Sequence, residues 1–155
     1  MPKRQGHSMN ELVRQQSTIT LRLAMQALQS ALDKAEEEQV RISIVVVDAG
    51  GQPIHSAHMD MAPRQSRDIA LNKALTAAGF GISTKAWQER LEKCSEGVRQ
   101  GLPLQRNMAM FGGGEPFLHD GQVIGAIGVS GASEAIDECC ACAAVEQVRA
   151  LLISS

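Results

Sequence analysis

The chain has 155 residues, enough for one domain with its own core, and its 44% apolar and 21% charged residues are typical of a globular protein. Its net charge of -2 offers no basic surface for nucleic acid, and no apolar run is long enough to span a membrane. The polar start lacks the apolar core of a signal peptide, and the four cysteines form no secreted disulfide framework, so we expect a cytoplasmic protein.

The first part of the chain predicts a helix followed by two strands. Residues 1–16 are expected to be a flexible N-terminal segment, ahead of a single domain over 17–155. A helix is predicted over 20–38, capped by Thr20, because its leucines and methionine recur at helical spacing. The β-branched run 42–47 predicts a buried strand, and the alternating run 52–59 predicts its returning partner.

The second part predicts two helices, a hairpin and a last helix. One helix is predicted from Pro63 to Gly79, and another from Ser83 or Thr84 to near Gly97. After a loop at 101–103 come a glycine-rich hairpin over 117–130 and a helix from Ser133 to about 152. This order predicts an α/β (α+β) fold, in which an antiparallel sheet of about four to five strands is flanked by helices.

The segment 111–131 combines seven glycines with β-branched residues. Glycine weakens a strand unless a backbone or ligand approaches closely, so we expect a bulged or closely approached strand behind a triglycine loop. The loop is not a Walker phosphate loop, because Glu115 and Pro116 follow where lysine and serine or threonine are required. A ligand-binding role and a structural role both remain open for it.

Two histidines are candidate ligands on the second strand. His55 and His58 are three residues apart, so a regular strand places them on opposite faces and they cannot bind one ion together. Each could act alone, His58 as the stronger and His55 as the weaker candidate for a haem-iron ligand, or each could be an ordinary polar residue. Met59 beside His58 adds a thioether as a second plausible ligand.

Lysine and cysteine supply the other candidates. Lys73 lies on an apolar helix face, where it either reaches out to solvent or places a charge in a pocket. The cysteines at 139, 140 and 142 lack the second pair that a structural zinc site needs, so buried apolar thiols are the favoured interpretation.

The chain resembles the GlcG/HbpS family, which includes the C-terminal domain of PduO-type proteins and is often labelled haem-degrading. The matching segments, which run in order through residues 18–152, are 44–51, 58–62, 69–77, 113–116 and 123–131, and Asp137 fits an acidic position after them. The family usually has arginine where this chain has His58.

The resemblance implies a profilin-like fold, self-assembly into dimers or larger rings, and binding of haem or another tetrapyrrole such as a corrinoid. It also implies an association with glycolate, glycerol or diol metabolism. The residues that we therefore expect at a ligand site are Asp48, His58, Met59, Lys73, Phe111, Gly112, Gly113, Gly114 and Ser130.

Three functions follow as alternatives. The first is a tetrapyrrole-binding accessory protein. The second is an enzyme acting on a small anionic metabolite in a pocket between Lys73 and the triglycine loop, with the loop amides holding the anion. The third is an assembly module without a ligand. Whether any reaction is catalysed stays open, and a homo-oligomer is expected because the apolar stripes of the first and last helices exceed what one chain covers.

Overall fold

The computed structural model describes residues 11–155, so most of the predicted N-terminal segment (1–10) lies outside the described residues. Residues 11–18 are exposed and contain no helix or strand. The elements that follow are α1 (Leu21–Glu37), β1 (Ser43–Asp48), β2 (Pro53–His58), α2 (Ser66–Phe80), α3 (Trp87–Glu92), α4 (Glu96–Gly101), β3 (Gly114–His119), β4 (Gln122–Ser130) and α5 (Glu134–Ser154), with 3₁₀ turns at Thr84–Ala86 and Leu102–Leu104.

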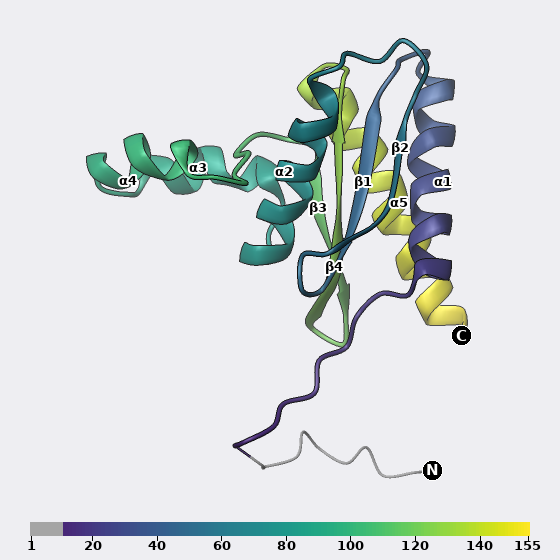
Figure 1. The fold of residues 1–155 in the computed structure, drawn as a ribbon, viewed down its shortest axis with the longest axis horizontal. Helices are drawn as coiled ribbons and strands as arrows, with labels where there is room; N and C mark the ends of the chain where they lie inside the picture. The colour runs from purple at the N-terminus through teal and green to yellow at the C-terminus, as the bar shows by residue number, and fades with distance from the viewer. Residues whose placement is uncertain (1–10) are drawn as a thin grey trace.

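The strands form one antiparallel sheet in the order β2-β1-β4-β3. Helices α1 and α5 cover one face of this sheet and α2 covers the other, as Figure 1 shows. The predicted α/β class, with a four-stranded antiparallel sheet flanked by helices, is confirmed. None of the helices among residues 11–155 is both long and apolar enough to cross a membrane.

The two faces of the sheet have different cores. The face under α1 and α5 carries the larger core, built from aliphatic side chains such as Ile44, Val46, Ile127 and Val129 around Phe117. The face under α2 carries a thin core in which Ala70, Ala74 and Ala77 meet Val45 and Val47. Small side chains on α2 therefore bring that helix very close to the sheet.

Gly128 shows how close this approach is. A Cβ atom at Gly128 would overlap the carbonyl oxygen of Ala70 in α2 and would lie 2.7 Å from the amide nitrogen of Ala74. Only a residue without a side chain fits between the sheet and this helix. The expectation of a closely approached strand is confirmed at this position.

The predicted helix boundaries hold for the long helices and fail between residues 63 and 104. Thr20 and Ser133 cap α1 and α5 through their side chains, as the sequence predicted. Helix α2 begins at Ser66, because residues 63–65 form a turn, and it ends on Gly81 in the left-handed conformation rather than at Gly79.

The single helix predicted from Ser83 or Thr84 to Gly97 is wrong. A 3₁₀ turn and α3 end at Lys93, and Ser95 then caps a separate helix, α4, by accepting a hydrogen bond from the Val98 amide. The predicted loop at 101–103 is the end of α4 and a 3₁₀ turn. Together these pieces form a helical arm that projects from the sheet and the helices that cover it (Figure 1).

Candidate functional site

His58 lies at the end of the edge strand β2 and joins a chain of hydroxyl groups under α2. Its Nδ1 atom is hydrogen-bonded to the hydroxyl of Ser43 on β1. The Ser43 hydroxyl is 2.8 Å from the hydroxyl of Ser66, which begins α2, and the Ser66 hydroxyl donates to the Pro63 carbonyl. Both serines are buried, so the chain holds the imidazole ring against the protein.

The direction of each hydrogen bond follows from the end of this chain. The Pro63 carbonyl can only accept, so the single hydroxyl proton of Ser66 is given to it. The proton of Ser43 is then given to Ser66, and Ser43 accepts from His58. A neutral His58 therefore carries its proton on Nδ1 and leaves the Nε2 lone pair for a ligand.

Two cavities adjoin His58. One, of about 290 Å³, is lined by Ser43, Ile44, Val45, Ser56, Ala57, His58 and Arg67. The other, of about 320 Å³, is lined by Leu32, Glu36, Arg41, Ala57, His58, Met59 and Asp60. His58 is thus the polar residue common to both.

Met59 shares the second cavity, but its sulfur also serves the fold. The Met59 Sδ atom accepts a hydrogen bond from the Ile42 amide at 3.4 Å, and the side chain packs against the larger core. The thioether is therefore held at the cavity wall by the backbone amide that directly precedes β1.

His55 and Asp48 lie away from this place. His55 is paired with Val46, whose side chain belongs to the larger core, whereas His58 is paired with Ser43. The two histidines are therefore on opposite faces of β2. Asp48, at the far end of β1, caps the turn into β2 by accepting from the amides of Gly50 and Gln52. Ser130 is buried at the end of β4, directly paired with Ser43, and so lies near His58.

Lys73 lies on α2, with its amino group enclosed. Its Nζ atom donates to the Val129 carbonyl at 2.8 Å and to the Asp137 carboxylate at 3.2 Å, and it lies 4.8 Å from the centre of the Phe111 ring. A Cβ atom at Gly113 would lie 2.7 Å from Nζ. The side chain is 1% exposed, so the amine has no open space beside it.

Burial governs the protonation of this pair. Removal from water lowers the pKa of the Lys73 amine below its usual 10.5, against the opposing effects of Asp137 and Glu134. Removal from water likewise raises the pKa of the Asp137 carboxyl, against the opposing charge of Lys73. Lys73 and Asp137 form an ion pair between α2 and α5 in which both side chains are buried.

Two amides of the triglycine loop donate to groups within the protein. The Gly112 amide donates to the Glu134 carboxylate at 2.7 Å, and the Gly114 amide donates to the Thr84 hydroxyl at 2.8 Å. The loop thus does bind an anionic group, but that group is a side chain of α5. This arrangement does not favour an external anion between Lys73 and the loop.

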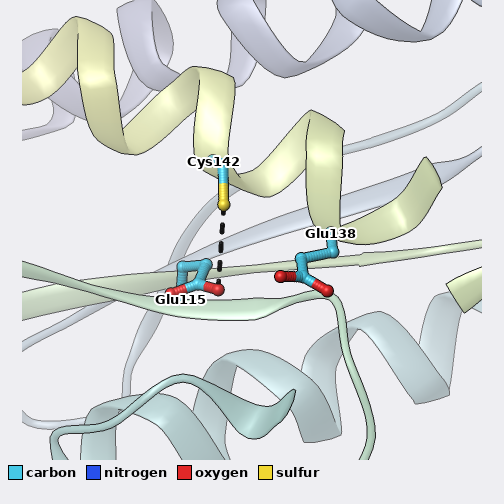
Figure 2. Close-up of side chains that lie close together, drawn as sticks. All are labelled: Glu115, Glu138 and Cys142. Carbon is cyan, nitrogen blue, oxygen red and sulfur yellow. Dashed lines mark hydrogen bonds between the residues drawn. The ribbon is translucent and has the colours of Figure 1, made fainter. Parts of the chain in front are cut away.

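A further group of side chains lies across the molecule, where β3 meets α5. Figure 2 shows the carboxylate of Glu115 on β3 facing the carboxylate of Glu138 and the thiol of Cys142, both on α5. One donor atom from each lies within 4.8 Å of the others, and the Cys142 sulfur is 3.9 Å from Glu115 Oε1. We call these three residues the Glu–Glu–Cys cluster.

The cluster was missed in the sequence. Glu138 and Cys142 are four residues apart on a predicted helix and so share a face, which is the signal that was available. Glu115 is brought to them only by the packing of β3 on α5. The expectation of buried thiols holds for Cys140, whereas Cys139 is exposed and Cys142 is half-buried.

Comparison with known proteins gives a consistent result. A family model described as "Haem degrading protein HbpS-like" matches residues 19–146. An uncharacterized 15.0 kDa protein from the dhaT-dhaS intergenic region of Citrobacter freundii is 38% identical over 115 residues, which is 74% of this chain and 81% of that protein.

Two solved structures are also similar. The Klebsiella pneumoniae protein ORFY superposes with a TM-score of 0.83 at 35% identity, covering 92% of this chain and 97% of that one. The PduOC:haem complex superposes with a TM-score of 0.76 at 27% identity, covering 84% of this chain and 94% of that one.

Proposed function

The chain belongs to the HbpS-like family, and from this membership we propose that it is an accessory protein that binds haem or a related tetrapyrrole such as a corrinoid. The similarity to PduOC, whose crystal structure is a haem complex, supports haem as the first ligand to test. The proposal retains the association with glycolate, glycerol or diol metabolism that the family resemblance implies.

The observation that carries the proposal is the proton arrangement at His58. Ligation of iron by an imidazole requires an unprotonated ring nitrogen, and the other nitrogen is normally held by a hydrogen bond that fixes the ring. The chain from His58 through Ser43 and Ser66 to Pro63 meets both requirements, leaving Nε2 as the ligand atom. Haem, if bound here, would supply an iron that Nε2 of His58 would hold.

The surroundings of His58 suit the rest of such a ligand. Val45, whose side chain lies on the α2 side of the sheet, gives the smaller cavity an apolar wall for a flat ring. Arg67 lines the same cavity, and its guanidinium is suited to pair with an acidic side group of a tetrapyrrole. Met59, the residue directly after β2, lines the other cavity.

Titration of the purified protein with hemin tests the proposal. The wild type should shift the Soret band with saturation at a fixed stoichiometry, and His58→Ala should abolish that shift. His55→Ala is the matched control, because it removes the other histidine of β2 from the opposite face and should leave the shift unchanged. A wild-type spectrum identical to that of free hemin would contradict the proposal, and cobalamin titrated in the same way separates haem from a corrinoid.

We also propose that the protein assembles with copies of itself. Leu21 and Met25 lie one turn apart on α1 and are 53% and 50% exposed, and Ile153 near the end of α5 is 79% exposed. Because each cavity at His58 is small compared with a tetrapyrrole, a neighbouring subunit is well suited to cover the remainder of the ligand.

A further inference from the structure

The Glu–Glu–Cys cluster has the composition of a cation site rather than of a solvated acidic surface. Its members come from two elements, β3 and α5, and all three are partly buried. Figure 2 shows the thiol directed at the Glu115 carboxylate from the α5 side, with the Glu138 carboxylate beside both. Two carboxylates do not require a thiol beside them for packing. The Cys142 thiol adds a sulfur donor to the two oxygen donors of the cluster.

The charges of the cluster are incompletely balanced. Lys85 forms an ion pair with Glu138 at 3.2 Å, but Lys85 is 65% exposed and reaches only one of the two carboxylates. Glu115 is contacted by a neutral donor, the Ser83 hydroxyl, at 2.7 Å. Two carboxylates and a thiolate would carry three negative charges, which Lys85 and one divalent cation together neutralise.

The outer contacts and the access route also fit a metal site. Ser83 and Lys85 hold the outer sides of Glu115 and Glu138, which is how second-shell groups orient metal ligands. The same two residues line a cavity of about 470 Å³ beside α3, so open space adjoins the residues that contact the two carboxylates. Around tetrahedral zinc, sulfur and oxygen ligands lie about 3 to 4 Å apart, so small side-chain rotations close the present spacing.

We propose that Glu115, Glu138 and Cys142 form a binding site for one thiophilic divalent cation of the zinc type. One thiolate with two carboxylate oxygens favours a borderline-soft ion over magnesium or calcium, which take oxygen ligands only. The three protein ligands leave a fourth position for water. The site lies on β3, at the opposite edge of the sheet from His58 on β2, and does not depend on the tetrapyrrole proposal.

Cadmium titration of the full-length, reduced protein tests the site, because cadmium bound to a thiolate gives an ultraviolet charge-transfer band. The wild type should develop this band with saturation at one cadmium per chain, and zinc should compete it away. Cys142→Ser should lose the band. Cys139→Ser is the matched control, because Cys139 lies one turn earlier on α5 and is exposed, and it should keep the band.

Calorimetric titration with zinc gives a second readout. Glu115→Gln and Glu138→Gln should each weaken zinc binding by roughly tenfold or more, and both keep the size of the native side chain. If Cys142→Ser fails to fold by circular dichroism, these two variants decide the question. Absence of a saturable band in the wild type, a band that survives in Cys142→Ser, or unchanged zinc affinity in both glutamine variants would overturn the proposal.

Discussion

At the scale of single residues, the chain from His58 to Pro63 decides which ring nitrogen carries a proton. At the proposed site the role of the two serines is to link the acceptor oxygen of the Pro63 carbonyl, through their hydroxyls, to Nδ1 of the imidazole. His58 was singled out from the sequence, but Ser43 and Ser66 were not. They lie 15 and 8 residues away from it in the chain, and only the packing of α2 against β1 and β2 brings the three side chains together.

Ser66→Ala should therefore weaken hemin binding without removing any group that contacts the ligand. Once Ser66 is lost, the Ser43 hydroxyl is free to donate to Nδ1, which favours the tautomer with its proton on Nε2. We expect the hemin affinity to fall on the order of tenfold in a Soret titration. Ser56→Ala is the control, because Ser56 lines the same cavity and is exposed but is not one of the hydrogen-bonded groups between His58 and Pro63. This variant should bind hemin as the wild type does.

Glu115 gives a prediction about pH. Burial raises the pKa of the Glu115 carboxyl above its usual 4.5, against the opposing hydrogen bond from Ser83. The folded protein therefore binds this proton more tightly than the unfolded chain does, and stability from this group is lost as the pH rises from 4.5 through the folded pKa. Glu115→Gln removes that loss because it stays neutral.

Urea unfolding in the presence of a chelator, at pH 4 and at pH 7, measures this effect. The quantity to compare is the free energy of unfolding of Glu115→Gln minus that of the wild type. This difference should be larger, meaning that the variant is relatively more stable, at pH 7 than at pH 4. Equal differences at the two pH values would show that the carboxyl is not destabilised by burial.

At the scale of elements, α2 packs against the sheet at Gly128 more closely than any other element packs against a glycine of residues 11–155. Gly128→Ala inserts a methyl group where the Ala70 carbonyl already lies, so α2 must shift from the sheet or the strand must bend. We expect a loss of about 3 kcal/mol in the free energy of unfolding, measured with urea. Gly97→Ala is the control: a Cβ atom there meets nothing within 4 Å, and alanine in helix α4 should be neutral or stabilising. A loss below about 1 kcal/mol in Gly128→Ala would show that α2 adjusts freely.

The sequence predicted the elements best where one signal dominated. Thr20 and Ser133 mark the two long helices, and the β-branched run at 42–47 marks the central strand, because capping and burial act locally. The prediction of one helix from Ser83 or Thr84 to near Gly97 fails because Ser95 caps a separate helix by accepting a hydrogen bond from the Val98 amide. The site residues divide in the same way: His58 and Cys142 carry recognisable chemistry, whereas the position of Glu115 depends on which strand packs under α5.

At the scale of the whole molecule, the exposed apolar side chains of α1 predict association. Light scattering after size exclusion, at micromolar concentration, should give at least the mass of a dimer. A double substitution, Leu21→Lys with Met25→Lys, should reduce that mass, because it places two charges on the exposed turn of α1. Leu104→Lys, which changes an exposed residue of the helical arm, is the control and should leave the mass unchanged. A monodisperse monomer of the wild type would contradict the prediction.

The close seating of α2 on the sheet has a consequence for the thermodynamics of ligand binding. Ser66 and Arg67 lie in the first turn of α2. Movement of this helix relative to the sheet is restricted, because its backbone packs directly against Gly128 without free space. Recognition at this end of the sheet then requires little ordering of the protein, and less of the interaction energy is lost to conformational entropy. A ligand bound here should therefore cost the protein little conformational entropy. Gly128→Ala should increase that entropic cost by loosening the contact between α2 and the sheet, although residue 128 does not contact the ligand.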